Sequence, residues 1–232
     1  MAWQRECTAG VGTRCDSVFV QALSRPAMAR PTLTAMGGAV LAATGHAVVG
    51  QFVDRQLART LYAMLQLRQV RGEAKRDGQV PGASSFWGDS TLDALLLAVR
   101  PEVEAVAGGL LLPTYCYARL YVHGDALERH RDREACEVVA SIHIGSRGLA
   151  PPPIRFAPDI EVHQRPGDAV VFLGSRLEHW RDPFQDTDFG QVFLNYVRAG
   201  GAYRHHAFDG RHQQFPSWMV EPTRQQHAGT VD

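Results

Sequence analysis

The sequence predicts an α+β fold in which helices come first and a core made only of β-strands follows. Apolar residues recur at helical spacing between about residues 48 and 70. After Gly109 the pattern changes to short strand-like runs, separated by turns that contain glycine and proline. Short strands at this spacing are typical of a sandwich or a barrel.

Three helices are predicted before the strands. The first covers residues 48–70, and the stretch 71–88, rich in glycine, serine and basic residues, is predicted to be a loop. Asp89 or Ser90 is suited to cap a second helix, because a short polar side chain accepts hydrogen bonds from the first turn. Pro101 fits the first turn of a third helix, where its missing N–H is not needed.

Five later runs are predicted to be strands. Turns at residues 145–148, 151–153 and 165–168 separate several of them. Because side chains alternate along a strand, the first run has one face made of Tyr115, Tyr117, Arg119 and Tyr121. The runs are Tyr115–Val122, Val138–Ile144, Ile160–Gln164, Ala169–Leu173 and Gln191–Arg198.

The length of 232 residues suits one domain with a loose extension. We expect residues 1–36 to form a flexible N-terminal extension and residues 37–232 to form the single domain. Within that domain we expect a helical part at about 46–108, the strand core at about 110–200 and a C-terminal tail at 201–232.

Composition limits the expected partners and location. The 24 basic and 24 acidic residues balance without a block of like charge, so no nucleic-acid partner is expected. No run reaches the roughly 18 apolar residues of a membrane span, so no membrane partner is expected. Four cysteines without a CxxC pair favour a reduced, cytoplasmic protein. The sequence leaves the oligomeric state open.

A candidate metal site begins with an HxD motif at His130 and Asp132. Residues two apart in an extended segment share a face, so this imidazole and this carboxylate can point at one ion. A mixed nitrogen and oxygen ligand set suits Fe(II). A third ligand must come from elsewhere, and His179, which follows the Pro-Gly-Asp turn at 166–168 and an apolar strand, is well placed to supply it. The motif alone is common, but the combination is more specific.

Five stretches of the chain together form a more extensive pattern. They are residues 112–121, Gly124 to Arg133, Pro166-Gly167-Asp168, Glu178-His179-Trp180-Arg181, and Gln191 to Tyr196. Over about residues 84–200 this pattern resembles the 2-oxoglutarate/Fe(II) oxygenase superfamily, specifically its prolyl-4-hydroxylase-like branch.

The resemblance implies a double-stranded β-helix (jelly-roll) core with N-terminal supporting helices, and metal ligands at His130, Asp132 and His179. It implies an oxidoreductase, a dioxygenase that couples decarboxylation of 2-oxoglutarate to hydroxylation of a small-molecule or peptide substrate. The expected cofactors are Fe(II), 2-oxoglutarate as co-substrate and O₂, with ascorbate as an accessory. Related halogenating enzymes typically have a small residue in place of the carboxylate ligand, so Asp132 favours hydroxylation.

The anchor for the distal carboxylate of 2-oxoglutarate departs from the family pattern. Family members usually bind it with Arg or Lys on the strand after the second histidine, where this chain has Gln191. The only lysine, Lys75, lies far upstream, so an arginine is expected to bind this carboxylate. We rank Arg181 first and Arg119 second, and we predict Tyr121 and Gln191 as further co-substrate contacts.

Two alternatives stay open on sequence grounds. The missing late-strand cation also fits a catalytically inactive jelly-roll module that binds a ligand without metal. Two histidines and one carboxylate partly fit a cupin-type Zn or Mn enzyme, although such sites more often add a fourth protein ligand. Joint binding of Fe(II) and 2-oxoglutarate would distinguish the oxygenase from both.

Overall fold

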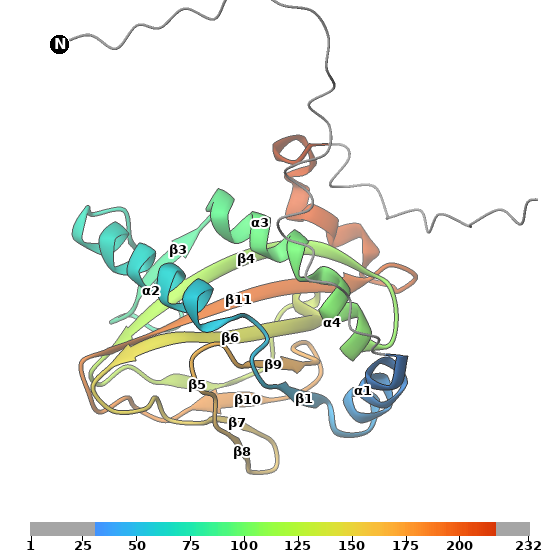
Figure 1. Cartoon of the computed structure of the whole chain (residues 1–232), viewed down its shortest axis with the longest axis horizontal. Coiled ribbons are helices and arrows are strands. Elements are labelled where there is room, and N and C mark those ends of the chain that lie inside the picture. Colours follow the sequence, from blue (N-terminus) through green and yellow to red (C-terminus); the bar gives the residue numbers. More distant parts are fainter. Residues whose placement is uncertain (1–30, 217–232) are drawn as a thin grey trace, which may run out of the picture. The chain divides into compact units, whose positions relative to one another are not determined.

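The computed structural model describes residues 31–216 of the chain (Figure 1). The extension predicted for residues 1–36 and the end of the tail predicted for 201–232 lie largely outside this range. The helices are α1 (Pro31–Thr44), α2 (Arg55–Val70), α3 (Ser90–Ala98) and α4 (Arg100–Ala107), with short 3-10 turns η1 (Glu134–Cys136), η2 (Arg204–Gly210) and η3 (His212–Gln214).

Two antiparallel sheets form the core. The larger has the strand order β1-β9-β6-β11-β4-β3-β2, and the smaller has the order β5-β10-β7-β8. The strands are β1 (His46–Val49), β2 (Lys75–Arg76), β3 (Ser84–Trp87), β4 (Leu111–Val122), β5 (Leu127–His130), β6 (Val138–Arg147), β7 (Ile154–Phe156), β8 (Ile160–Val162), β9 (Ala169–Phe172), β10 (His179–Arg181) and β11 (Asp188–Arg198).

From β4 to β11 the chain passes repeatedly between the two sheets. Strands β4, β6, β9 and β11 lie side by side in the large sheet, while β5, β7, β8 and β10 make up the small sheet. Four antiparallel strands facing four others is the arrangement of the double-stranded β-helix. The predicted jelly-roll core with supporting helices is therefore confirmed.

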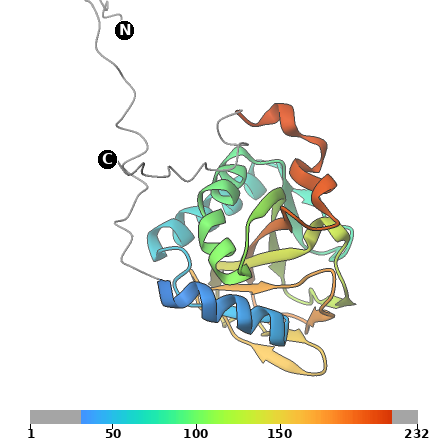
Figure 2. The same cartoon turned by 90° about the vertical axis from the view of Figure 1, so that its right-hand side faces the viewer.

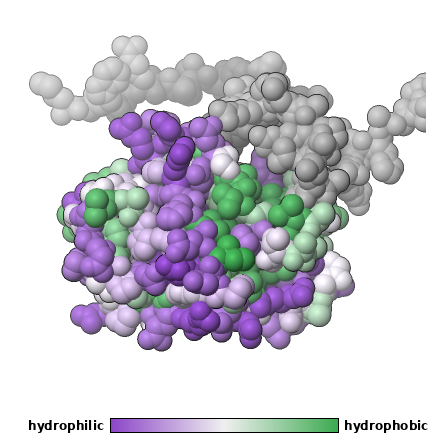
Figure 3. All heavy atoms as spheres, turned by 90° about the horizontal axis from the view of Figure 1, so that it is seen from below, coloured by the Kyte–Doolittle hydropathy of each residue, from purple (hydrophilic) through white to green (hydrophobic). Residues whose placement is uncertain are grey.

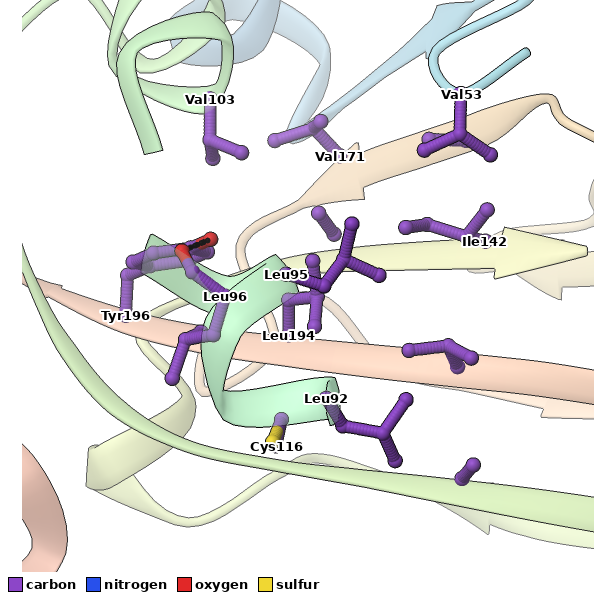
Figure 4. Close-up of a cluster of buried hydrophobic side chains, with 14 of the residues drawn as sticks. Val53, Leu92, Leu95, Leu96, Val103, Cys116, Ile142, Val171, Leu194 and Tyr196 are labelled. Carbon is purple, nitrogen blue, oxygen red and sulfur yellow. Dashed lines mark hydrogen bonds between the residues drawn. The ribbon is translucent and has the colours of Figure 1, made fainter. Parts of the chain in front are cut away.

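Helices cover the face of the large sheet that is turned away from the small sheet (Figure 1). Leu92 and Leu96 of α3 share one buried apolar cluster with Leu194 of β11 (Figure 4). In the same cluster the hydroxyl of Tyr196 donates a 2.7 Å hydrogen bond to the carbonyl of Leu96. Because side chains alternate along β4 and β11, the neighbouring positions in these strands point the other way, into the space between the sheets.

The second and third predicted helices are confirmed. The carboxylate of Asp89 accepts hydrogen bonds from the backbone N–H groups of Thr91 and Leu92, at 2.8 and 3.1 Å, and so caps α3. Helix α4 has its proline in the first turn and ends at Gly108, whose φ of 70° suits glycine. A Cβ on Gly38 of α1 would lie 2.9 Å from the Cα of Gly108, so α1 packs closely against the end of α4 (Figure 2).

The predictions for residues 31–88 were wrong in three places. Residues 46–49 form strand β1, and helix α2 begins only at Arg55, because the Asp54 carboxylate accepts a 2.8 Å hydrogen bond from the N–H of Leu57 and caps it there. The predicted loop at 71–88 contains β2 and β3. Helix α1 begins within the segment assigned to the flexible extension and was not predicted.

The surface on the side of the small sheet is mostly hydrophilic, with hydrophobic residues gathered near its middle (Figure 3). In this sheet Arg155 forms ion pairs with Asp159, Glu161 and Asp182. No helix within residues 31–216 is both long enough and apolar enough to cross a membrane.

Candidate active site

The three residues predicted to bind a metal lie together at one end of the small sheet. His130 ends β5, His179 begins β10, and the two face each other in the antiparallel pairing. Their Nε2 atoms lie 3.3 and 3.7 Å from the two carboxylate oxygens of Asp132. One donor atom from each of the three residues lies within 4.8 Å of the other two. This geometry and this donor set fit a single Fe(II) ion with open coordination positions.

Each imidazole is fixed by a main-chain carbonyl. Nδ1 of His130 lies 2.8 Å from the Glu128 oxygen, and Nδ1 of His179 lies 3.0 Å from the Leu177 oxygen. Because a carbonyl can only accept, each Nδ1 carries the proton and leaves the Nε2 lone pair for a metal. Burial lowers the pKa of His179, which favours the neutral ring. Burial also opposes protonation of His130, but hydrogen bonds to Asp132 and the Glu128 carbonyl outweigh it and raise its pKa.

Gly174 leaves room for the carboxylate ligand. Its carbonyl accepts a 2.9 Å hydrogen bond from the N–H of Asp132, which fixes the segment after β5. A Cβ at Gly174 would overlap the Asp132 carboxylate and lie 2.6 Å from the carbonyl oxygen of Cys136. Backbone at this distance cannot move aside as a flexible side chain would, so only glycine fits beside the site.

Gly174→Ala is therefore expected to lower Fe(II) affinity by about 10–100-fold, the range found when residues that orient a metal ligand are changed. Titration with Fe(II) under anaerobic conditions measures this. Gly200→Ala is the matched control, because a Cβ there meets nothing within 4 Å, and it should leave affinity unchanged. Wild-type affinity in Gly174→Ala would mean that Asp132 does not depend on this space.

A cavity of about 440 Å³ opens beside the three candidate ligands and is lined by residues of both sheets. Arg119, Tyr121 and Arg181, all predicted co-substrate contacts, line it. The cavity is also lined by three residues of the stretch predicted to be a loop, Asp77, Gln79 and Trp87, which the sequence did not predict as site residues.

Arg181 is a buried cation in this cavity. It lies in β10 two residues after His179, and the residue is only 5% exposed. The guanidinium donates to the carbonyl of Pro152 and lies 5.3 Å from the centre of the Phe189 ring. Within the described part of the chain it forms no ion pair with an acid, and burial lowers the pKa of Arg181 to about 10. A buried, unpaired charge is costly, so this position favours an anionic ligand.

Arg119, the second-ranked anchor, already forms an ion pair with a carboxylate of the protein. Its Nε and Nη2 donate to the two oxygens of Asp77 at 2.8 and 3.0 Å, and Nη2 also donates to Gln79 at 3.1 Å. Its Nη1 donates to the hydroxyl of Tyr121 at 2.9 Å, and that ring stacks on Phe189 with centroids 4.4 Å apart. Arg119 thus positions Tyr121, while its own charge is matched by Asp77.

Gln191 does not line the cavity. Its side-chain amide donates to the Ser141 hydroxyl at 2.8 Å and to the side-chain oxygen of Gln164 at 3.0 Å. The residue therefore belongs to a buried hydrogen-bond network beside the cavity. The structure brings the three candidate ligands together with Arg181, Arg119 and Tyr121, but not with Gln191.

The similarity of this chain to known proteins is found in its structure. No family model and no curated protein matches the chain. A prolyl-4-hydroxylase from Pseudomonas putida superposes with a TM-score of 0.59 at 22% identity, over 72% of this chain and 100% of that one. The epimerase SnoN of nogalamycin biosynthesis, in complex with Fe³⁺ and α-ketoglutarate, superposes with a TM-score of 0.65 at 14% identity, over 87% and 93%.

A third example is the prolyl hydroxylase of Trichoplax adhaerens, in complex with a peptide of the hypoxia inducible factor. Its TM-score is 0.56 at 15% identity, over 71% of this chain and 89% of that one. At identities this low, the superpositions establish the fold alone, because one fold can carry many activities. The chain thus has the double-stranded β-helix fold of the 2-oxoglutarate/Fe(II) oxygenases, as found in prolyl-4-hydroxylases.

Proposed function

We propose that this chain is an Fe(II)- and 2-oxoglutarate-dependent dioxygenase that hydroxylates a small-molecule or peptide substrate and releases succinate and CO₂. The observation that carries the proposal is the placement of His179 and Arg181 on one strand beside one cavity. The first belongs to the candidate metal site, and the second is a buried cation that favours an anion. A dicarboxylate that chelates iron at one end and needs a cation at the other matches both.

The proposed function assigns the candidate residues to metal binding and to co-substrate binding. His130, Asp132 and His179 would hold Fe(II), which, when bound, supplies the activation of O₂ for oxidation of both 2-oxoglutarate and substrate. Arg181 would bind the distal carboxylate, and burial strengthens that charge-assisted hydrogen bond because water does not screen it. In the balanced reaction one oxygen atom enters succinate and the other enters the new hydroxyl group.

Anaerobic addition of Fe(II) and 2-oxoglutarate is expected to produce a weak visible charge-transfer band, because the 2-oxo acid chelates the iron. Absorption spectroscopy in a sealed cuvette measures it, with Zn(II) in place of Fe(II) as the control. Absence of the band would favour the metal-free binding module or the Zn or Mn enzyme instead.

Mass spectrometry of the product then tests the reaction type. Hydroxylation adds one oxygen atom for each succinate formed. SnoN has this fold and is an epimerase. Succinate formation with no oxygen added to the substrate would therefore assign this chain to a different oxidation.

A further inference from the structure

The cavity has more positive charge than the proposed reaction uses. Four arginines and two aspartates line it: Arg119, Arg131, Arg133 and Arg181 with Asp77 and Asp132. These side chains carry a net positive charge. The two positive charges of Fe(II) and the two negative charges of 2-oxoglutarate cancel each other, so binding of both leaves that net positive charge in the cavity.

Three of the four arginines have a defined counter-charge. Arg119 is paired with Asp77, and Arg181 is the proposed anchor of the co-substrate. Arg133 forms a 3.2 Å ion pair with Asp209, which lies outside the lining, and its guanidinium lies 4.4 Å from the centre of the Tyr115 ring. These three side chains are therefore committed before any substrate binds.

Arg131 is the arginine that remains. It lies between His130 and Asp132, is exposed, and lines the cavity. Among residues 31–216 it forms no ion pair and no hydrogen bond. Arg129, two residues earlier, does not line the cavity, and it forms a 3.2 Å ion pair with Glu178. Arg131 thus lies at the exposed edge of the cavity, between two candidate metal ligands in the sequence, with no described counter-charge.

The wall supplied by the large sheet is aromatic. Tyr117 of β4 stacks on Phe193 of β11 with ring centroids 4.5 Å apart, and Trp87 of β3 lies opposite Tyr117 in the strand pairing. All three line the cavity, and Trp87 is 45% exposed, which places it toward the solvent. Flat apolar surfaces of this kind favour an apolar or aromatic body in the ligand.

The volume of the cavity limits the size of the substrate. Small-molecule pockets span about 300–1,000 Å³, and this cavity of about 440 Å³ also has to hold 2-oxoglutarate. What enters is therefore a small molecule or a single side chain of a peptide.

We propose that the substrate carries a carboxylate or phosphate group bound by Arg131 and an apolar, flat body that packs against Tyr117, Phe193 and Trp87. Guanidinium binds both anions through paired hydrogen bonds. This inference rests on the proposed function, because it names the substrate class of the same site.

The test is calorimetric titration of the full chain, loaded anaerobically with Fe(II) and 2-oxoglutarate, with matched pairs of probes. The pairs are 3-phenylpropionate and its amide, indole-3-acetate and its amide, phenyl phosphate and phenol, and N-acetyl-aspartyl-phenylalanine amide with its asparaginyl counterpart. In at least one pair the anion should bind about tenfold or more tightly than the neutral partner. The pair that shows the preference identifies whether the anion comes from a free acid, a phosphate or a peptide.

Arg131→Ala should remove that preference, and the matched control Arg129→Ala should keep it. Equal affinity within every pair, no binding of any probe, or a preference that survives in Arg131→Ala would overturn the inference. The charge-transfer band distinguishes failure of this inference from failure of the proposed function. A normal band without anion preference overturns this inference alone, whereas loss of the band overturns the proposed function as well.

Discussion

His179→Ala is expected to reduce succinate formation to the level seen without protein. The variant removes one of the three candidate metal ligands, and no other described residue belongs to this group of ligands. His130 and Asp132 alone cannot complete the set of two histidines and one carboxylate that holds Fe(II). Succinate release from 2-oxoglutarate, measured with Fe(II) in excess, reports the effect. His130→Ala and Asp132→Ala should behave in the same way, with circular dichroism showing an unchanged fold in each variant.

His123→Ala is the matched control for these three variants. His123 is exposed, lies seven residues before His130, and is not among the cavity-lining residues. It should form succinate at the wild-type rate. If any of the three site variants retains that rate, its residue does not bind the metal.

Arg181→Ala is expected to raise the 2-oxoglutarate concentration needed for half-maximal turnover by about tenfold or more. A charge-assisted hydrogen bond contributes roughly 1.5–3 kcal/mol, and this one is buried. Fe(II) affinity should change far less, because Arg181 is not among the three candidate ligands. Arg181→Lys, which keeps the charge but loses the planar fork, should fall between the wild type and the alanine variant.

Arg119→Ala distinguishes the anchor from its neighbour. Removing Arg119 leaves the buried carboxylate of Asp77 without its partner, so the main effect should be a lower melting temperature. If Arg119→Ala instead gives the large increase in the 2-oxoglutarate requirement and Arg181→Ala does not, the anchor lies on β4. If neither variant changes the requirement, the binding-module alternative gains support.

The parts of this site that the sequence could predict depend on short-range geometry. His130 and Asp132 are two residues apart, and Arg181 follows His179 at the same spacing, so an extended backbone places each pair on one face. The long alternating strand β4 likewise assigns Arg119 and Tyr121 to one face before any partner strand is known.

The parts that could not be predicted depend on pairing between distant segments. Strands β7 and β10 have three residues each, too few for a recognisable alternation. Asp77 meets Arg119, 42 residues later, only because β3 pairs with β4 in a register that sets Ser85 opposite Arg119. Gln191 occupies the expected position along its strand, but Ser141 on the adjacent β6 binds its amide.

The division of the cavity between the two sheets bears on how such a protein can evolve. The candidate metal ligands and the proposed co-substrate anchor lie on β5, on β10 and, for Asp132, just after the end of β5. The aromatic wall comes from β3, β4 and β11. A substitution at Trp87 or Phe193 reshapes the wall without touching a candidate ligand. Selection can therefore change which molecule is accepted while the candidate metal site and the proposed co-substrate anchor stay unchanged, and an engineer can follow the same route.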